Sequence, residues 1–160
     1  MTIRSAREDD VESVTRLHFL VREVSMPYLP VLHTVEDALV FFATVFKSSY
    51  VLVAEYERAI IAYASFRADW LDRLYVHPGH QRRGIGSALL ERAMRATGSL
   101  KLWVFQRNVG ARKFYERHGF ALVRVTDGSG NEEREPDVLY EWPSQRSASP
   151  GRQLAKASRV

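Results

Sequence analysis

Residues 74–90 read LYVHPGHQRRGIGSALL, and this stretch decides how the rest of the chain is interpreted. It begins with apolar residues typical of a strand, continues as a basic loop with glycines, and ends in a helical pattern. The start of such a helix presents free backbone N–H groups and a partial positive charge to an anion. Gly84 and Gly86 allow the backbone to approach that anion closely, and Arg82 and Arg83 add charge. The stretch therefore predicts a pyrophosphate site, against the alternative of a helix that merely begins with glycine and arginine.

Two common pyrophosphate motifs do not fit these residues. A Rossmann fingerprint requires a third glycine three residues after Gly86, where this chain has Leu89. A P-loop requires lysine and then serine or threonine after its last glycine, but Ser87 and Ala88 follow Gly86. Dinucleotide-binding and P-loop proteins are therefore excluded by individual residues.

Apolar periodicity predicts the other elements of the fold. Helical spacing is expected over residues 11–24, 35–46, 83–96 and 109–118, and strands over residues 2–6, 50–55, 60–66, 70–76, 100–105, 120–126 and 138–142. The predicted order is β-α-α-β-β-β-α-β-α-β-β, without internal repeats or a second core. The fold class expected from this order is α/β (α+β), one domain with a mixed, mostly antiparallel sheet of about seven strands and four helices.

Composition limits the classes of protein that remain. The chain has 160 residues, of which 46% are hydrophobic and 26% charged, as in an ordinary globular domain with a real core. The absence of cysteine excludes disulfides, thiolate metal sites and a cysteine nucleophile. The N-terminal residues are polar, and no apolar run reaches the ~20 residues that span a bilayer, so a cytoplasmic protein without a membrane role is expected.

The net charge of +4 belongs to the end of the chain. Four of the 23 basic residues and no acidic residue follow Pro143, so the 19 basic residues before it equal the 19 acidic ones. We therefore expect a domain over residues 1–143, a basic and disordered tail over residues 144–160, and no dedicated nucleic-acid binding. His77 and His80 flank a turn without a third ligand at metal spacing, so we expect loop histidines and no metal site.

A second motif follows the predicted strand at residues 100–105. Residues 108–120 read NVGARKFYERHGF, and together with residues 81–86, QRRGIG, they carry a family resemblance. The pair resembles the motifs Q/R-x-x-G-x-G/A and N-x-x-A-x-x-F-Y-E-x-x-G-F of the GNAT superfamily of acyl-CoA-dependent N-acyltransferases. The resemblance covers essentially residues 2–142, and the element order above agrees with the family fold.

The resemblance implies acetyl-CoA as co-substrate and assigns residues to it. The pantetheine arm would be bound by the backbone of Leu74, Tyr75 and Val76, where two strands splay. Residues of the first motif and its helix start would hold the pyrophosphate, namely Gln81, Arg82, Arg83, Gly84, Ile85, Gly86 and Ser87. Asn108 would hydrogen-bond the arm near the thiol, a role compatible with its alternative as a helix N-cap.

The resemblance also implies a proton donor. Tyr115 would protonate the leaving CoA thiolate, since a phenol of pKa ~10 is a sensible donor to a thiolate; its alternative role is a core aromatic. The general base is less defined, because the positions of the family's strand glutamates align with Trp70 and Trp103. Asp72 is the candidate base, against the alternative of a solvated or Arg73-paired carboxylate. A neutral amine or a water relay could make a base dispensable.

The expected function is transfer of an acetyl group from acetyl-CoA to a primary amine of a small molecule or peptide, by direct attack in a ternary complex. The alternative is a non-catalytic acyl-CoA-binding or sensing module with the same fold. The loop over residues 131–137 is acidic, and it is either a solvated charge run or an attractor of a cationic amine. The resemblance is compatible with a homodimer, because dimers are common among members of that family.

Overall fold

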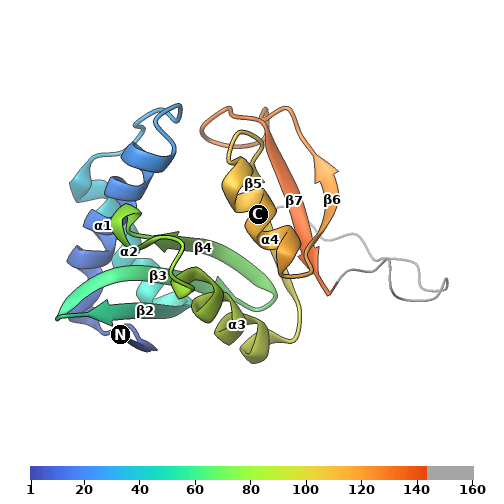
Figure 1. Cartoon of the computed structure of the whole chain (residues 1–160). Coiled ribbons are helices and arrows are strands. Elements are labelled where there is room, and N and C mark those ends of the chain that lie inside the picture. The colour runs from blue at the N-terminus through green and yellow to red at the C-terminus, as the bar shows by residue number, and fades with distance from the viewer. Residues whose placement is uncertain (144–160) are drawn as a thin grey trace.

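The structure, a computed structural model, describes residues 1–143; the expected tail after Pro143 lies outside the described residues. Seven strands form one mixed sheet in the order β1-β2-β3-β4-β5-β7-β6, with four α-helices around it (Figure 1). The fold class and the element order predicted from the sequence are confirmed. No helix within residues 1–143 is long and apolar enough to cross a membrane.

The elements have the following bounds. The helices are α1 (Val11–Ser25), α2 (Val35–Ser48), α3 (Ile85–Thr97) and α4 (Val109–Arg117), with short 3₁₀ turns at Glu8–Asp10 and Pro78–His80. The strands are β1 (Thr2–Ser5), β2 (Tyr50–Tyr56), β3 (Ala59–Arg67), β4 (Trp70–Val76), β5 (Leu100–Phe105), β6 (Ala121–Val125) and β7 (Asp137–Trp142).

Two apolar cores lie on opposite faces of the sheet. The larger one contains the buried residues of α3 and Tyr115 of α4, packed on β3, β4, β5 and β7. The smaller one joins α1 and α2 to β2 and β3 through residues such as Phe42 and Tyr63. Figure 1 shows α1 and α2 at one side of the molecule and α4 with β6 and β7 at the other, with β4 between them.

Some local expectations differ from the structure. The third helix begins at Ile85, two residues later than expected, because Gly84 adopts φ +79° and ends the loop in a left-handed conformation. Aromatic side chains on strands favour the core, but Tyr50 and Tyr56 are 71% and 43% exposed. They are the first and last residues of β2.

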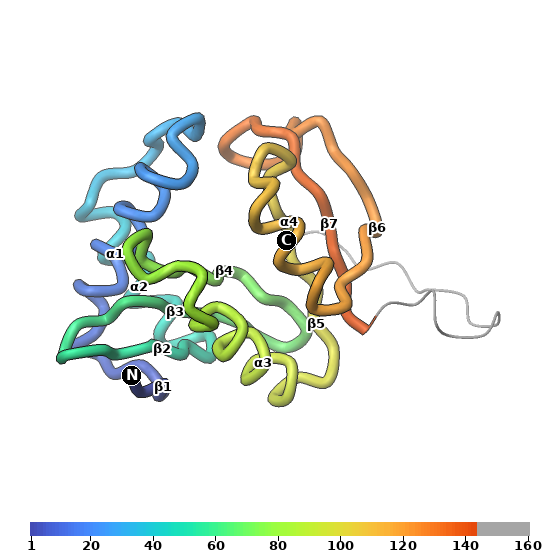
Figure 2. The backbone as a smooth tube through the Cα atoms, in the orientation of Figure 1, coloured from blue at the N-terminus to red at the C-terminus, as the bar shows by residue number. Residues whose placement is uncertain are grey.

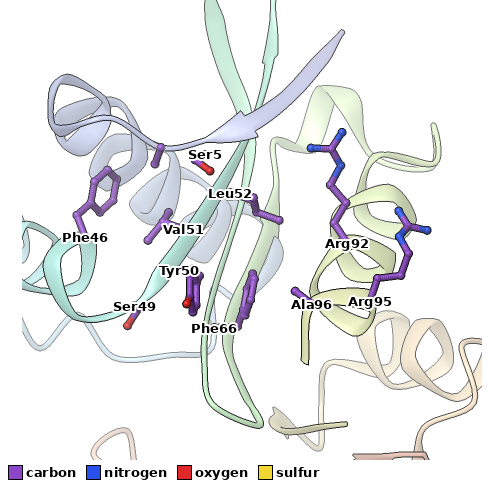
Figure 3. A pocket seen from close by; sticks show the side chains of 11 residues that line it. Ser5, Phe46, Ser49, Tyr50, Val51, Leu52, Phe66, Arg92, Arg95 and Ala96 are labelled. Atoms are coloured by element: carbon purple, nitrogen blue, oxygen red, sulfur yellow. The ribbon is translucent and has the colours of Figure 1, made fainter. Parts of the chain in front are cut away.

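A solvent-open cavity of about 590 Å³ lies away from the residues that the sequence singles out. It is bounded by the start of β2, by Phe66 and by one side of α3 (Figure 3). Tyr50 stacks on Phe66 there with a centroid distance of 5.6 Å, and Arg92 and Arg95 stand on α3 beside them. No sequence-predicted site residue lines this cavity.

Candidate active site

The sheet opens between its two central strands. β4 and β5 run parallel, yet they pair at a single register position, Trp70 with Lys101. β5 then pairs with β7 along its whole length, while β4 stays paired with β3. We call this opening the fork. Residues 74–76, which the family resemblance assigns to pantetheine binding, lie in the part of β4 beyond its single pair with β5 among the described residues.

The loop between β4 and α3 ends in a helix start without a side-chain cap. Gly84 is the N-cap of α3, and no side chain accepts a hydrogen bond from the first N–H groups there. Arg82 also has a positive φ of 60°, and both Arg82 and Arg83 are exposed. The Gln81 side chain donates to the Val76 carbonyl at 3.1 Å, which ties the loop back to the end of β4. These free N–H groups and guanidinium groups suit an anionic ligand.

Helix α4 is anchored to the sheet through a buried phenol. The Tyr140 hydroxyl on β7 donates to Glu116 at 2.7 Å and accepts from Nε of Arg112 at 3.2 Å. Asn108 caps the helix, because its side-chain oxygen accepts from the Ala111 backbone N–H at 3.2 Å. The N-cap alternative for Asn108 is therefore present in the structure, and it leaves the amide NH₂ group available for another partner.

The two motifs meet at one point beside the fork. A Cβ added to Gly86 would lie 3.4 Å from Cζ of Phe114 and 3.6 Å from a methyl carbon of Val76. The start of α3, the face of α4 and the end of β4 are therefore in contact. Gly86 is small because it packs against these side chains, a role that the sequence argument about phosphate approach did not include.

Tyr115 lies on α4, one residue from this contact. Its side chain is buried and packs edge-on against Phe114 and Phe120, with centroid distances of 5.1 and 5.5 Å. Burial raises the pKa of Tyr115 above its usual value, and the nearby Tyr75 raises it further. The phenol is therefore protonated at neutral pH and can donate a proton.

Asp72, the candidate base, lies at a break in the strand pairing. The β3–β4 register passes from Ser65–Arg73 to Phe66–Leu71, so Asp72 is the extra residue of a β-bulge. Its carboxylate accepts from Nε of Arg67 at 3.1 Å. The alternative pairing of Asp72 with Arg73 does not occur. Asp72 forms its ion pair with Arg67, at the end of β3.

A cluster of polar aromatic groups lies on the other face of β4. His18 of α1 shares a hydrogen bond with the Tyr63 hydroxyl, with 2.9 Å between nitrogen and oxygen. It also packs against Tyr75 at a centroid distance of 5.1 Å. Burial, with smaller effects of Arg73 and Arg22, lowers the pKa of His18 to about 3. The sequence signal for this burial is the helical spacing of His18 with Val14 and Val21.

Segments from the two halves of the chain meet beyond the fork. Arg22 on α1 pairs with Glu133 at 3.2 Å, and His33 pairs with Glu132 at 2.6 Å. Figure 2 shows the α1–α2 connection and the β6–β7 loop converging at the same end of the molecule. The acidic loop is therefore tied to the α1–α2 connection.

Comparisons with known proteins agree with this geometry. The family profile for the acetyltransferase (GNAT) domain matches residues 47–122. YwnH of Bacillus subtilis, provisionally named a phosphinothricin acetyltransferase, is 30% identical over 139 residues, covering 76% of this chain and 84% of that protein. The chain belongs to the GNAT acetyltransferase family. The resemblance of the two motifs to that family is thereby confirmed.

Other relatives of this GNAT domain match over shorter segments. The mycothiol acetyltransferase of Saccharomonospora viridis is 37% identical over 76 residues, which is 46% of this chain. The match covers 22% of that protein, so less than a quarter of its length has a counterpart in this alignment. Among solved structures, yncA from Salmonella typhimurium with its cofactor acetyl-CoA has a TM-score of 0.70 and 22% identity, covering 94% of this chain and 98% of its own. This similarity shows the GNAT fold.

Proposed function

We propose that this GNAT domain transfers the acetyl group of acetyl-CoA to a primary amine of a small molecule or peptide. The observation that carries the proposal is the fork, where β4 leaves β5 after one pair and Val76 at the end of β4 lies beside Gly86 of α3. An extended strand edge offers backbone groups to an amide-containing chain such as pantetheine. The uncapped helix start lies at one end of that edge and suits the pyrophosphate.

Each predicted residue then has a task in direct transfer within a ternary complex. The backbone of Leu74, Tyr75 and Val76 binds the pantetheine arm and polarises the thioester carbonyl. The segment from Gln81 to Ser87 holds the pyrophosphate, and the Asn108 amide contacts the arm. Tyr115 donates its proton to the leaving sulfur, which would otherwise depart as a thiolate among buried aromatic rings.

The amine must lose a proton as its bond to the acetyl carbon forms. Asp72 is proposed as its acceptor; in the structure its carboxylate accepts a hydrogen bond from Arg67. Most of the rate enhancement is expected from binding both reactants in one place, since this makes a bimolecular step nearly unimolecular.

The test is release of free thiol from acetyl-CoA in the presence of a panel of amines, followed by mass spectrometry of the products. A product heavier by one acetyl group, formed only with the enzyme, supports the proposal. Tight binding of acetyl-CoA without thiol release for any amine would support the alternative, a non-catalytic acyl-CoA-binding module. No binding of acetyl-CoA would overturn both.

A further inference from the structure

The β-bulge at Asp72 determines where Arg73 points. Leu71, before the bulge, packs in the core formed with α3. Strict alternation would send Arg73 to that same face. The extra residue shifts the alternation, so Leu74 and Val76 take the α3 face and Tyr75 joins the core under α1 and α2. Arg73 accompanies Tyr75, with its guanidinium carbon 4.8 Å from the ring centroid of Phe41 on α2.

Arg73 has no counter-ion among the described residues. The salt bridges of residues 1–143 do not include it, and the neighbouring Asp72 is taken by Arg67. Its charge nevertheless acts on the groups around it, because it helps to lower the pKa of His18 and opposes the rise in pKa of Tyr63 and Tyr75. A half-buried guanidinium beside aromatic rings, without a carboxylate, is a natural partner for an anion.

The acidic loop does not supply that anion. Glu133 pairs with Arg22, Glu132 with His33, and Glu135 with Arg107 through two contacts of 2.6 and 2.9 Å. These carboxylates are already engaged within the domain, so they offer little to a cationic amine.

The Tyr28 hydroxyl provides a second, independent observation. It is buried and has no hydrogen-bond partner within residues 1–143. Arg107 covers the ring of Tyr28 at 4.5 Å from its centroid. Burial and Glu135 raise the pKa of Tyr28, with a smaller effect of Tyr75. A buried hydroxyl without a partner is costly, and a polar group bound near Tyr28 would remove that cost.

We propose that Arg73 is a specificity-determining residue of the acceptor site, and that the acceptor is a small amine carrying a carboxylate or a similar anionic oxyacid group. Arg73 binds the anionic group of this acceptor. Arg73 precedes Tyr75 by two residues, about 7 Å along a strand. One small molecule can therefore reach Arg73 and place its amine at the fork. This inference rests on the proposed amine acetylation and adds the substrate class.

The experiment compares amines that differ only in the anionic group. The probes are the L-amino acids and phosphinothricin against the corresponding carboxamides, with spermidine and kanamycin as polycationic amines. Binding to the protein saturated with CoA is measured by calorimetry, and thiol release from acetyl-CoA is measured separately. The variants are Arg73→Gln, Arg73→Lys and, as a matched control, Arg124→Gln, since Arg124 also covers an aromatic ring, that of Trp103 at 5.3 Å.

At least one carboxylate or phosphinate amine should bind wild type roughly 10- to 100-fold more tightly than its carboxamide. Arg73→Gln should abolish this preference through a higher Kd and KM, while Arg73→Lys should keep part of it and Arg124→Gln all of it. An anionic amine and its carboxamide differ in basicity, but this difference is the same for every variant. It therefore cancels when the preference for the anionic amine is compared between variants.

The outcomes separate this inference from the proposed function. Equal or tighter binding of carboxamides or polycations, or an unchanged preference in folded Arg73→Gln, would overturn the inference even if thiol is released. Binding that depends on Arg73 without thiol release would overturn amine acetylation and keep the anion site. If no anionic amine of the panel binds wild type, the inference is wrong.

Discussion

At the scale of single residues, Tyr115 combines two properties that a proton donor in this place needs. Its ring is held between Phe114 and Phe120, and burial raises the pKa of its hydroxyl. The same packing suits a core aromatic, so a variant that removes only the hydroxyl distinguishes a proton donor from a core residue.

Replacing Tyr115 with phenylalanine removes the hydroxyl and keeps the ring. We expect acetyl-CoA affinity to stay within a few-fold while turnover falls by ~10²-fold, the usual contribution of a positioned acid. Steady-state kinetics with a verified amine and calorimetry with CoA measure the two quantities. Phe120→Leu serves as a control for packing in the same cluster. Unchanged turnover would make Tyr115 a core residue, and collapsed affinity would give it a structural role.

His18 makes stability depend on pH. Its pKa is about 3 in the folded chain against 6.5 in the unfolded chain. Between pH 6.5 and pH 3, His18 is therefore protonated in the unfolded chain and stays neutral in the folded chain. The stability contributed by neutral His18 is complete above pH 6.5 and is lost as pH falls toward 3.

Urea unfolding at about pH 7.5 and pH 5 tests this dependence. Between these conditions wild type should lose about 1–2 kcal/mol more than His18→Gln, whose side chain does not titrate. The difference between the two proteins removes the contribution of the carboxylates, which both share. Equal losses would show that His18 titrates normally in the folded chain.

At the scale of elements, helix α3 has a glycine of left-handed conformation at each end. Gly84 at its start has φ +79° and Gly98 at its end has φ +76°, and an added Cβ would meet no atom within 4 Å at either. The two positions therefore carry similar strain but differ in their distance from the proposed pyrophosphate seat.

This symmetry provides a matched pair of variants. Gly84→Ala and Gly98→Ala should each cost about 1 kcal/mol of stability, the cost of a side chain in that conformation. Only Gly84→Ala should also weaken CoA binding, by roughly tenfold or more, because its methyl group and altered loop disturb the bound phosphates. Thermal unfolding and calorimetry are the measurements. Equal CoA affinities in the two variants would place the pyrophosphate elsewhere.

Gly86 is less suited than Gly84 to testing the proposed pyrophosphate site. A larger side chain there would press on Phe114 and Val76 before it met any ligand. A loss of CoA affinity in such a variant would mix packing with binding.

At the scale of the whole molecule, the two halves of the sheet are joined at their base and meet again through ion pairs. Within residues 1–143, Trp70 and Lys101 provide the only strand pairing between them, and Arg22 with Glu133 joins them at the far end.

Removal of residues 144–160 should leave the domain intact. The tail carries the whole excess of positive charge and has no apolar periodicity, so we expect unchanged thermal stability and acetyl-CoA affinity. A full-length variant with Arg146, Arg152, Lys156 and Arg159 changed to glutamine separates the effect of charge from that of length. A large loss in the truncated protein would show that the tail packs on the domain or on a second copy.

Much of the fold could be predicted from local patterns. Apolar periodicity and glycine positions identified the four helices and seven strands in order, because each pattern reports which face of one element is buried. The two motifs pointed to a single region, and the contact of Gly86 with Phe114 and Val76 shows that they do meet. Sequence spacing could do this because both motifs start helices directly after strands.

The acceptor side could not be predicted in this way. Strict alternation along β4 would place Arg73 and Tyr75 on the face of Leu71, but the bulge at Asp72 reverses their faces. The ion pair of Arg22 with Glu133 joins residues 111 positions apart, and no local sequence pattern predicts it. Sequence periodicity was enough for the elements and their order, because burial repeats along one element. The register between strands and the pairing of distant charges arose only when the elements packed, because they depend on which residues stand opposite one another.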